Sequence, residues 1–368
     1  MRITAAVAPE AGARFTLETV ELDDPRDDEI LVRVLGVGLC HTDLVARDGL
    51  FPFQLPAILG HEGAGIVERV GGAITKVKPG DKVVLSFRSC GTCPSCAAGV
   101  PAYCHLLPAL NFIGMRPDGS TAARMGDVPV ATNFFAQSSF ATYALAYERN
   151  VVKVAPDAPV EILGPLGCGV QTGAGGIMRS LACEKGSSLL VMGGGAVGLS
   201  AVMAAVVVGC STIMVLEPHA ERRALALSFG ATHALDPAAG PLAEQVRAIL
   251  PEGVNYAFDT TGLPAVIEGA LASLAPRGSL GIVGVPPAGL ETFPVATSQL
   301  MTFGHTIRGI IEGDSDPETF IPELVRLNAE GRFPFDRLIK TYPLSAINEA
   351  IEDQHHGKCV KVVLLTGA

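Results

Sequence analysis

The sequence has no long hydrophobic run and no excess of positive charge. Its most apolar stretch, residues 201–208, is far shorter than the roughly 18 residues that cross a bilayer. Arginine and lysine together number 27 against 37 aspartates and glutamates, which gives a net charge of −10. A nucleic-acid partner needs a basic face that neutralises phosphates. We therefore expect no membrane span and no nucleic-acid partner.

The N-terminus also lacks the apolar core and the small-residue cleavage site of a secretory signal. Cysteine is nevertheless plentiful, with nine in 368 residues. Outside an oxidising compartment these thiols stay reduced, so we expect a cytoplasmic protein. The chain is long enough for two or three domains around a large buried core.

Four of the cysteines lie close together, in Cys90-Gly-Thr-Cys93-Pro-Ser-Cys96 and at Cys104. Tetrahedral zinc takes four thiolates at such spacing, and the intervening Gly and Pro residues let the backbone coil around an ion. Disulfides are the alternative, but they need an oxidising compartment and usually a short chain. We predict a zinc ion that holds this loop together, because four thiolates leave no open position for a substrate.

The pattern of apolar residues changes along the chain. Residues 1–155 contain short apolar or alternating runs broken by Gly and Pro, which predict a β-rich region. From residue 187, predicted strands alternate with predicted helices, which is typical of an α/β fold with a parallel sheet covered on both faces. The main expected elements are strands at 29–38, 63–70, 82–85, 140–147, 188–192, 212–216, 254–258, 279–283 and 359–365, and helices at 196–208, 221–229, 265–274 and 317–328.

A glycine-rich turn follows the strand expected at 188–192. Gly193, Gly195 and Gly198 match G-x-G-x-x-G, in which the glycines permit a tight turn, backbone approach to a pyrophosphate and close helix packing. The next expected strand ends at Glu217, where an acid would hydrogen-bond the adenosine ribose and repel a 2′-phosphate. NAD is therefore favoured over NADP. Arg222 leaves the alternative open, because a nearby arginine can receive a 2′-phosphate.

Three further residues have metal-ligand chemistry in unusual surroundings. Cys40 ends an expected strand, His61 lies in Gly-His-Glu-Gly, and Cys168 lies in a glycine-rich segment. Long-range ligands leave no local spacing signature, and a buried cysteine is more often a small apolar residue than a ligand. Taken alone, these residues predict no site.

Considered together, the motifs resemble a known family. Cys40-His-Thr-Asp, Gly60-His-Glu, the four-cysteine loop and the Gly193–Gly198 turn occur in the order found in zinc-dependent medium-chain alcohol dehydrogenases. The segment 164–175 further resembles the aryl-alcohol (benzyl alcohol) dehydrogenase branch. The resemblance implies a second, catalytic zinc held by Cys40, His61 and Cys168, hence two zinc ions per chain, with NAD as the hydride acceptor.

The resemblance also implies roles for neighbouring residues. Thr42 would accept the alcohol proton, Asp43 would orient His61, and Glu62 would approach the zinc, although a core ion pair is an equal alternative for Glu62. Val45 stands where better-known members have the last histidine of the proton relay. The expected cofactor contacts are His41, Thr172, Gly193, Gly195, Gly198, Glu217, Arg222, Val283, Val285 and Lys361. A surface lysine is the alternative for Lys361.

The implied fold is a GroES-like β-rich catalytic domain at 1–165 and a Rossmann doubly wound sheet at 166–305. A C-terminal segment at 306–368 would complete the sheet edge and return to the catalytic domain. The implied activity is reversible oxidation of primary aryl or allylic alcohols by a homodimer, with a tetramer as a further possibility. Expected substrate-pocket residues are Phe51, Phe87, Leu110 and Val285.

Three alternatives stay open at this point. Two are activities within the family: glutathione-dependent formaldehyde dehydrogenase and a general primary alcohol dehydrogenase. The third is a catalytically silent family member that only binds nucleotide, which the intact set of ligand residues disfavours. The remaining cysteines, Cys183, Cys210 and Cys359, fall in apolar patterns and are expected to fill the core.

Overall fold

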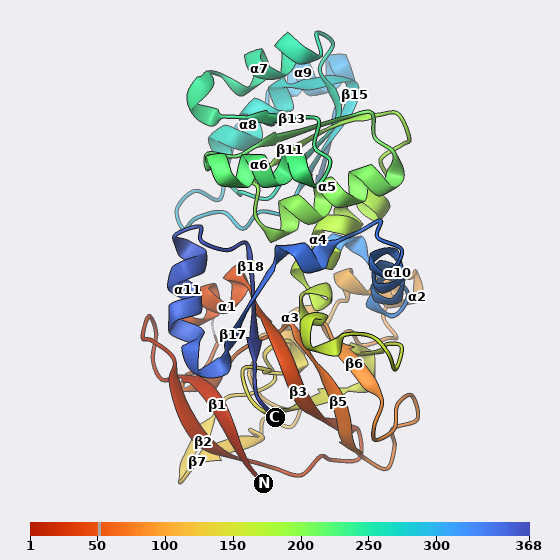
Figure 1. Ribbon diagram of the computed structural model, residues 1–368. Coiled ribbons are helices and arrows are strands. Elements are labelled where there is room, and N and C mark those ends of the chain that lie inside the picture. Colours follow the sequence, from red (N-terminus) through yellow and green to blue (C-terminus); the bar gives the residue numbers. More distant parts are fainter. Residues whose placement is uncertain (51–52) are drawn as a thin grey trace. The chain divides into compact units, whose positions relative to one another are not determined.

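The computed structural model describes residues 1–50 and 53–368, and the chain forms two compact units (Figure 1). The first unit contains residues 1–169, 316–326 and 336–368, and the second contains residues 170–315 and 327–335. The sequence predicts borders after residues 165 and 305, and the chain passes between the units after residues 169, 315, 326 and 335. No helix among the described residues is long and apolar enough to cross a membrane.

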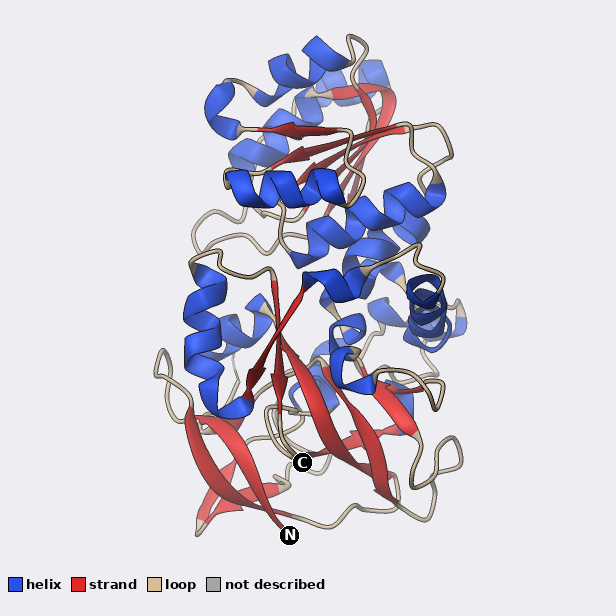
Figure 2. Cartoon of the chain, viewed as in Figure 1, coloured by secondary structure: helices blue, strands red, loops and turns tan. Residues whose placement is uncertain are grey.

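The first unit is built from an antiparallel sheet and a mixed sheet, in which β17 and β18 pair in parallel (Figure 2). One has the strand order β4-β1-β2-β7-β8, and the other has the order β10-β6-β5-β3-β18-β17, with β9 also paired to β3. The strands are β1 (Arg2–Ala8), β2 (Thr16–Leu22), β3 (Glu29–Leu39), β4 (Ala57–Ile58), β5 (Gly63–Val70), β6 (Lys82–Leu85), β7 (Ala123–Met125), β8 (Val128–Val130), β9 (Tyr143–Tyr147), β10 (Val151–Lys153), β17 (Ile339–Pro343) and β18 (Lys361–Leu365).

Strand β3 is buried on both faces because it separates two apolar cores. Ile30 and Val32 pack into one cluster, while Leu31 and Val34 pack into the other. Such a position needs apolar side chains on both faces, and Glu29 and Arg33 are the only charged residues of β3; register shifts after Leu31 and Val34 interrupt its regular alternation. The far end of β3 is therefore held rigidly, and it carries Cys40 into the site described below.

The chain's last strand returns to this sheet. β18 pairs antiparallel with β3, with Val362 opposite Leu39 and Val363 opposite Gly38. This pairing places Lys361 at the same end of the sheet as Cys40. The α-helices that belong wholly or partly to this unit are α1 (His41–Arg47), α2 (Pro94–Ala97), α3 (Leu107–Asn111), α10 (Pro317–Ala329) and α11 (Ile347–His355).

The second unit contains a six-stranded sheet in the order β13-β12-β11-β14-β15-β16, in which every paired strand is parallel. This is the order of a doubly wound dinucleotide-binding fold, and it confirms the predicted fold class. Its elements are β11 (Ser188–Met192), β12 (Thr212–Leu216), β13 (His233–Leu235), β14 (Val254–Asp259), β15 (Leu274–Ile282), β16 (Thr306–Gly309), α4 (Gly169–Gly175), α5 (Ala196–Val208), α6 (Ala220–Ser228), α7 (Leu242–Ile249), α8 (Pro264–Ala272) and α9 (Thr297–Phe303).

Helices cover both faces of this sheet, with α5 and α6 on one side and α7 and α8 on the other (Figure 1). Val246 of α7 and Ile267 of α8 pack with Leu190 and Met214 of the sheet in one core cluster. β11 is buried along its whole length, which explains its continuous apolar sequence. The glycine-rich turn follows β11 at its carboxyl end, beside β14, where the direction of winding reverses.

Candidate functional site

Four potential metal ligands meet in the first unit. One ligand atom from each of Cys40, His61, Glu62 and Cys168 lies within 4.8 Å of the others. Cys40 follows β3 as the cap of α1, His61 and Glu62 lie between β4 and β5, and Cys168 directly precedes α4. The structure thus gathers two thiols, an imidazole and a carboxyl from segments that are far apart in the sequence.

Asp43 orients the imidazole of His61. Its Oδ1 lies 2.7 Å from His61 Nδ1 and accepts a hydrogen bond from the Gly60 amide at 3.2 Å. Its Oδ2 accepts the Cys40 amide at 2.9 Å. Because an ionised carboxylate only accepts, the proton of a neutral imidazole must sit on Nδ1. Nε2 then presents its lone pair to the cluster, where it is buried without a well-formed hydrogen bond to any described residue.

Replacing Asp43 with asparagine should lower alcohol oxidation by about 10- to 100-fold and weaken zinc binding, because outer partners of ligand histidines have effects of this size. Asp48→Asn, at an exposed carboxylate paired with Arg47 at the end of the same helix, is the matched control. Steady-state kinetics and zinc retention against a chelator measure both effects. Equal zinc retention in the two variants would contradict this role for Asp43.

An aromatic turn packs on His61. The Phe135 ring stacks on the imidazole at 4.4 Å between centroids and 23° between planes, and Phe134 meets it edge-on at 5.5 Å. Phe135, Ala136 and Ser138 adopt positive φ angles of 51°, 56° and 51°, which are unfavourable for residues other than glycine. Strain of this kind persists only where the surroundings impose it.

Hydrogen bonds hold this turn in place. Gln137 Nε2 donates to the carbonyl of His61 at 2.8 Å, and its Oε1 accepts the Gly63 amide at 3.0 Å. Ser138 Oγ donates to the carbonyl of Ile58 at 2.6 Å. The sequence analysis missed Phe134, Phe135 and Gln137. The adjacent pair of phenylalanines, in a chain with only 5% aromatic residues, was the available signal.

Glu62 and Lys361 form a buried ion pair within this cluster. Lys361 Nζ lies 2.8 Å from Oε1 and 2.5 Å from Oε2 of Glu62, and it also donates to the carbonyl of Leu39 at 3.0 Å. Both side chains are at most 2% exposed. A Cβ atom on Gly38 would lie 1.9 Å from Glu62 Oε2, so only glycine fits there. Lys361 therefore balances a buried carboxylate here, rather than being a surface lysine.

Protonation in the cluster reflects this crowding. The hydrogen bond with Cys168 lowers the pKa of the Cys40 thiol well below its usual value, against the effect of burial. Burial raises the pKa of Glu62 to about 7, although the nearby Lys361 opposes that shift. Burial also opposes a charged His61, but Asp43 outweighs it and raises the pKa of the imidazole. A thiolate at Cys40 is the form that binds metal.

The donor set fits zinc. Two cysteines and one histidine, with a further position left for a small ligand, form a known catalytic zinc set. A neutral imidazole held at Nδ1 by Asp43 would offer Nε2 to a metal ion, and the Cys40 thiol is easily ionised. Of the residues expected beside them, Thr42 is half-buried and its Oγ1 accepts a hydrogen bond from Cys40 Sγ at 3.8 Å, His41 is exposed, and Val45 is buried in the core.

The second cysteine cluster is also assembled. The sulfurs of Cys90, Cys93, Cys96 and Cys104 gather within 4.8 Å, and all four are free thiols. Backbone amides point at them: Cys93 N donates to Cys90 Sγ at 3.3 Å, and Cys90 N donates to Cys104 Sγ at 3.2 Å. Such amides lower the pKa of Cys90 to about 5, while burial raises that of Cys104 to about 11. The set fits a closed four-thiolate zinc site.

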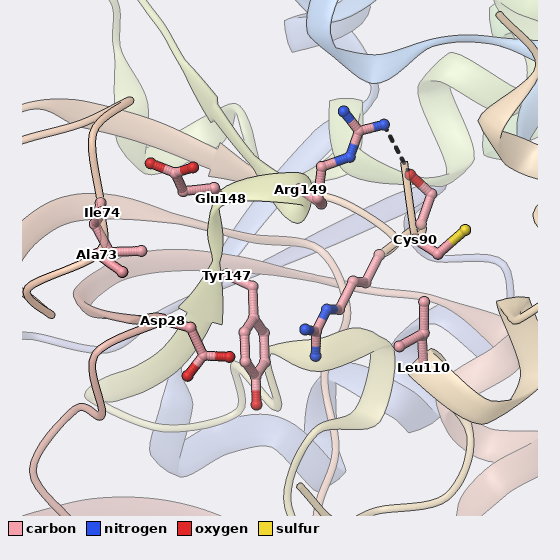
Figure 3. Close-up of a pocket in the computed structure, with 10 residues that line it drawn as sticks. Asp28, Ala73, Ile74, Cys90, Leu110, Tyr147, Glu148 and Arg149 are labelled. Atoms are coloured by element: carbon pink, nitrogen blue, oxygen red, sulfur yellow. Dashed lines mark hydrogen bonds between the residues drawn. The ribbon is translucent and has the colours of Figure 1, made fainter. Parts of the chain in front are cut away.

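A pocket of about 340 Å³ lies beside this second cluster (Figure 3). The Arg88 guanidinium lies 3.5 Å from the centre of the Tyr147 ring, and Arg149 donates to Ser89 Oγ at 3.1 Å. Cys90 lines the pocket together with both arginines. Cys90 connects this pocket with the four-cysteine loop.

The residues expected to line a substrate pocket belong to both units. Leu110 lines the pocket beside Cys90, Phe87 is 2% exposed in the core, and Val285 is 50% exposed in the second unit. Phe51 lies outside the described residues. Phe134 and Phe135 are aromatic residues that contact His61, one of the candidate metal ligands.

The glycine-rich turn of the second unit has the geometry that a dinucleotide site needs. Gly193 has φ = 99°, and a Cβ atom on Gly198 would lie 1.9 Å from the Gly193 carbonyl oxygen. Gly195 has open space around it, which leaves room for a phosphate group. The amide of Gly194 donates to Glu217 Oε2 at 2.7 Å, so this carboxylate anchors the turn.

Glu217 has a second partner that the sequence analysis did not identify. Its Oε1 accepts the amide of His219 at 3.0 Å and lies 2.6 Å from His219 Nδ1. Burial disfavours its charge, but the bonds from His219 and Gly194 outweigh this and lower the pKa of Glu217. Arg222 is near enough to contribute, and its Nε is buried without a hydrogen bond to a described residue. Thr172 is buried in α4. Val283 directly follows β15, and its backbone amide donates a hydrogen bond to the Asp259 carbonyl at 2.9 Å.

Comparison with known proteins agrees with these features. The model of the alcohol dehydrogenase GroES-like domain matches residues 26–157, and that of the zinc-binding dehydrogenase matches residues 196–329. A geraniol dehydrogenase from Castellaniella defragrans is 48% identical over 363 residues, covering 98% of this chain and 97% of that protein.

Solved structures agree over the whole chain. An alcohol dehydrogenase zinc-binding domain protein from Burkholderia ambifaria has a TM-score of 0.97 and 51% identity. Benzyl alcohol dehydrogenase from Acinetobacter calcoaceticus has a TM-score of 0.95 and 44% identity, and each comparison covers 99% of both chains. On its fold, its ligand sets and these relatives, this chain belongs to the family of zinc-dependent medium-chain alcohol dehydrogenases.

Proposed function

We propose that this enzyme oxidises primary allylic and aryl alcohols to aldehydes, reversibly, with NAD as the hydride acceptor. The observation that carries the proposal is the convergence of Cys40, His61 and Cys168, with Asp43 holding the imidazole of His61 at Nδ1. When bound there, zinc supplies the Lewis acidity that eases loss of the alcohol's proton. We expect a second zinc at the four-cysteine loop.

The residues around the cluster suggest how the proton and the ligands are managed. Asp43 fixes the orientation of the His61 imidazole. The ion pair with Lys361 holds the Glu62 carboxylate in place beside the other ligand residues. The Thr42 hydroxyl lies 3.8 Å from Cys40 Sγ, and we assign it the role of accepting the alcohol proton and releasing it. Val45 is buried and carries no proton, so we expect water to complete the relay.

The substrate class rests on the surroundings of His61 and on the relatives. Phe134 and Phe135 make the neighbourhood of the imidazole apolar and aromatic, which suits an unsaturated alcohol. Two relatives are a geraniol dehydrogenase and a benzyl alcohol dehydrogenase. In both alcohols the reacting carbon is next to a π system, which eases hydride loss by conjugation.

A panel of alcohols tests this assignment. With zinc-quantified enzyme and NAD, we expect kcat/KM for geraniol and benzyl alcohol to exceed that for ethanol by about tenfold or more, because burying extra apolar groups adds binding energy. Faster turnover of S-hydroxymethylglutathione than of benzyl alcohol would assign the formaldehyde-dehydrogenase activity instead. Equal turnover of ethanol would indicate a general alcohol dehydrogenase, and no turnover of any alcohol would indicate a nucleotide-binding protein.

The choice of NAD rests on the charge of Glu217. Glu217→Gln keeps an acceptor for the Gly194 amide but removes the charge that would repel a 2′-phosphate. We expect the ratio of kcat/KM for NAD to that for NADP to fall by about 10- to 100-fold. This corresponds to the free energy of a hydrogen bond to a charged group, here the one from the NAD ribose to the Glu217 carboxylate. Glu221→Gln, at an exposed acid in the same region, should leave the preference unchanged. An unaltered preference in Glu217→Gln would exclude Glu217 as the determinant.

We also propose a homodimer in the cytoplasm. Strand β16 ends the parallel sheet, and apolar side chains near it are exposed, including Met301 at 80% and Phe303 at 44%. An edge strand with apolar neighbours favours pairing with a second copy. The nine free thiols fit a reducing compartment. Light scattering on the purified enzyme measures the mass; a monomer at micromolar concentration would contradict the dimer.

A further inference from the structure

A third group of cysteines lies outside both metal clusters, in the second unit. Cys183 precedes β11 and is 6% exposed, while Cys210 follows α5 and is partly exposed. The Cys183 thiol is hydrogen-bonded to the sulfur of Cys210, and both residues are reduced. The sequence predicts that both cysteines fill the core, and this is wrong for Cys210.

The backbone holds the two residues side by side. The Gly186 amide donates to the Gly209 carbonyl at 2.8 Å, and the Ser211 amide donates to the Ser187 carbonyl at 2.8 Å. These bonds lead directly into the paired strands, where Ser188 lies opposite Thr212. The two cysteines therefore lie just before the start of β11 and of β12, two strands that pair along their whole length.

The two thiols differ in acidity and access. Ser187 Oγ lies 3.6 Å from Cys210 Sγ. The hydrogen bond from Cys183 lowers the pKa of Cys210 to about 7, against the effect of burial. The same bond, together with burial, raises the pKa of Cys183. Tyr256 is near both sulfurs and also near Glu184. The Lys185 side chain lies against Gly209, next to Cys210. A partly exposed thiol with a lowered pKa is the type that reacts with oxidants.

We propose that Cys210 is a site of oxidation by hydroperoxides and that Cys183 is its resolving thiol. The Cys210 thiolate attacks a peroxide oxygen, so that an S–O bond forms, the O–O bond breaks and the leaving hydroxide takes a proton to become water. The Cys183 sulfur then attacks Cys210 sulfenic acid, an S–S bond forms, and the hydroxyl leaves with the Cys183 proton as a second water. In total, two thiols are oxidised by two electrons, and one hydrogen peroxide is reduced to two waters.

The expected product encloses the nucleotide-binding turn. A Cys183–Cys210 disulfide would close the segment 183–210, which contains β11, the Gly193–Gly198 turn and α5. Such a link restricts the unfolded chain and should raise the melting temperature of the oxidised enzyme above that of the reduced enzyme. A thiol reductant should reverse the change, because no metal ligand is involved.

Peptide mapping of the zinc-loaded enzyme tests the proposal. Trypsin cleaves after Arg179, Lys185 and Arg222, which leaves the two cysteines in separate peptides, 180–185 and 186–222, with one cysteine each. After hydrogen peroxide and alkylation, we expect these peptides linked, with a mass two hydrogens below their sum. At pH 7, Cys210 should be alkylated faster than Cys183, because it is the more exposed thiol and their hydrogen bond favours its thiolate.

Two variants make the outcome specific. Cys183→Ser should accumulate sulfenic acid at Cys210, detected as a dimedone adduct, and Cys210→Ser should form neither adduct nor link. The link should appear before a chromophoric chelator detects released zinc. Oxidation of the metal-cluster cysteines with Cys210 still reduced would overturn the proposal, and so would a linked peptide that forms only after denaturation. The wild-type map decides the question even where a variant fails to fold.

Discussion

Cys40→Ser should abolish alcohol oxidation and leave the enzyme with one zinc ion per chain. Cys40 is positioned at the end of β3, and its thiol is hydrogen-bonded to Cys168 and easily ionised. A serine hydroxyl stays protonated at neutral pH and is a poor ligand. Removing a residue that only orients a metal ligand costs up to about 100-fold in activity. Removing the ligand itself should cost more, so we expect kcat to fall by more than about 100-fold. Steady-state kinetics and metal analysis measure the two losses together.

The matched control for this variant is Cys359→Ala. Cys359 is a buried cysteine of the same unit that lies in neither metal cluster. It should keep both zinc ions and near-normal kcat, with at most a modest loss of stability. If Cys40→Ser retained two zinc ions and turned over alcohol at the control rate, the assignment of Cys40 would be wrong.

Cys93→Ser should lower the melting temperature by about 10 °C while the catalytic zinc is retained. The four-cysteine loop has few other means of support: α2 has only four residues, none of them buried. A metal that gathers four thiolates contributes several kcal/mol to such a loop, and about 4 kcal/mol corresponds to about 10 °C in a unit of this size. Calorimetry and metal analysis should show one remaining zinc ion.

Ser95→Ala tests whether the loop itself is sensitive to substitution. Ser95 lies between Cys93 and Cys96 and is not a ligand candidate. Its replacement should change the melting temperature by less than about 1–2 °C, as for most surface substitutions. Equal destabilisation by Cys93→Ser and Ser95→Ala would show that the loop does not depend on a metal.

Local patterns predicted the regular elements well. The expected strands 188–192 and 212–216 and the expected helix 196–208 match β11, β12 and α5 residue for residue. Predictions failed where the backbone is irregular. The strand expected at 279–283 begins at Leu274, because a bulge with Arg277 at φ = 64° interrupts its pairing with β14. Such a kink leaves no periodic signal in the sequence.

The two metal clusters differed in how far the sequence could predict them. The spacing of Cys90, Cys93, Cys96 and Cys104 predicted the four-cysteine cluster, because these residues are close together in the sequence. Cys40, His61 and Cys168 were suggested by resemblance alone. The pairing of Glu62 with Lys361 joins residues 299 positions apart, and stacking of Phe135 on His61 depends on a turn held by tertiary hydrogen bonds. No local pattern encodes such contacts.

A crystal of the zinc-loaded enzyme, measured at the zinc absorption edge, tests the central claim directly. An anomalous difference map should show two peaks per chain. One should contact Cys40 Sγ, His61 Nε2 and Cys168 Sγ, and the other should contact the sulfurs of Cys90, Cys93, Cys96 and Cys104. A single peak at the four-cysteine loop, with no density between Cys40, His61 and Cys168, would contradict the account.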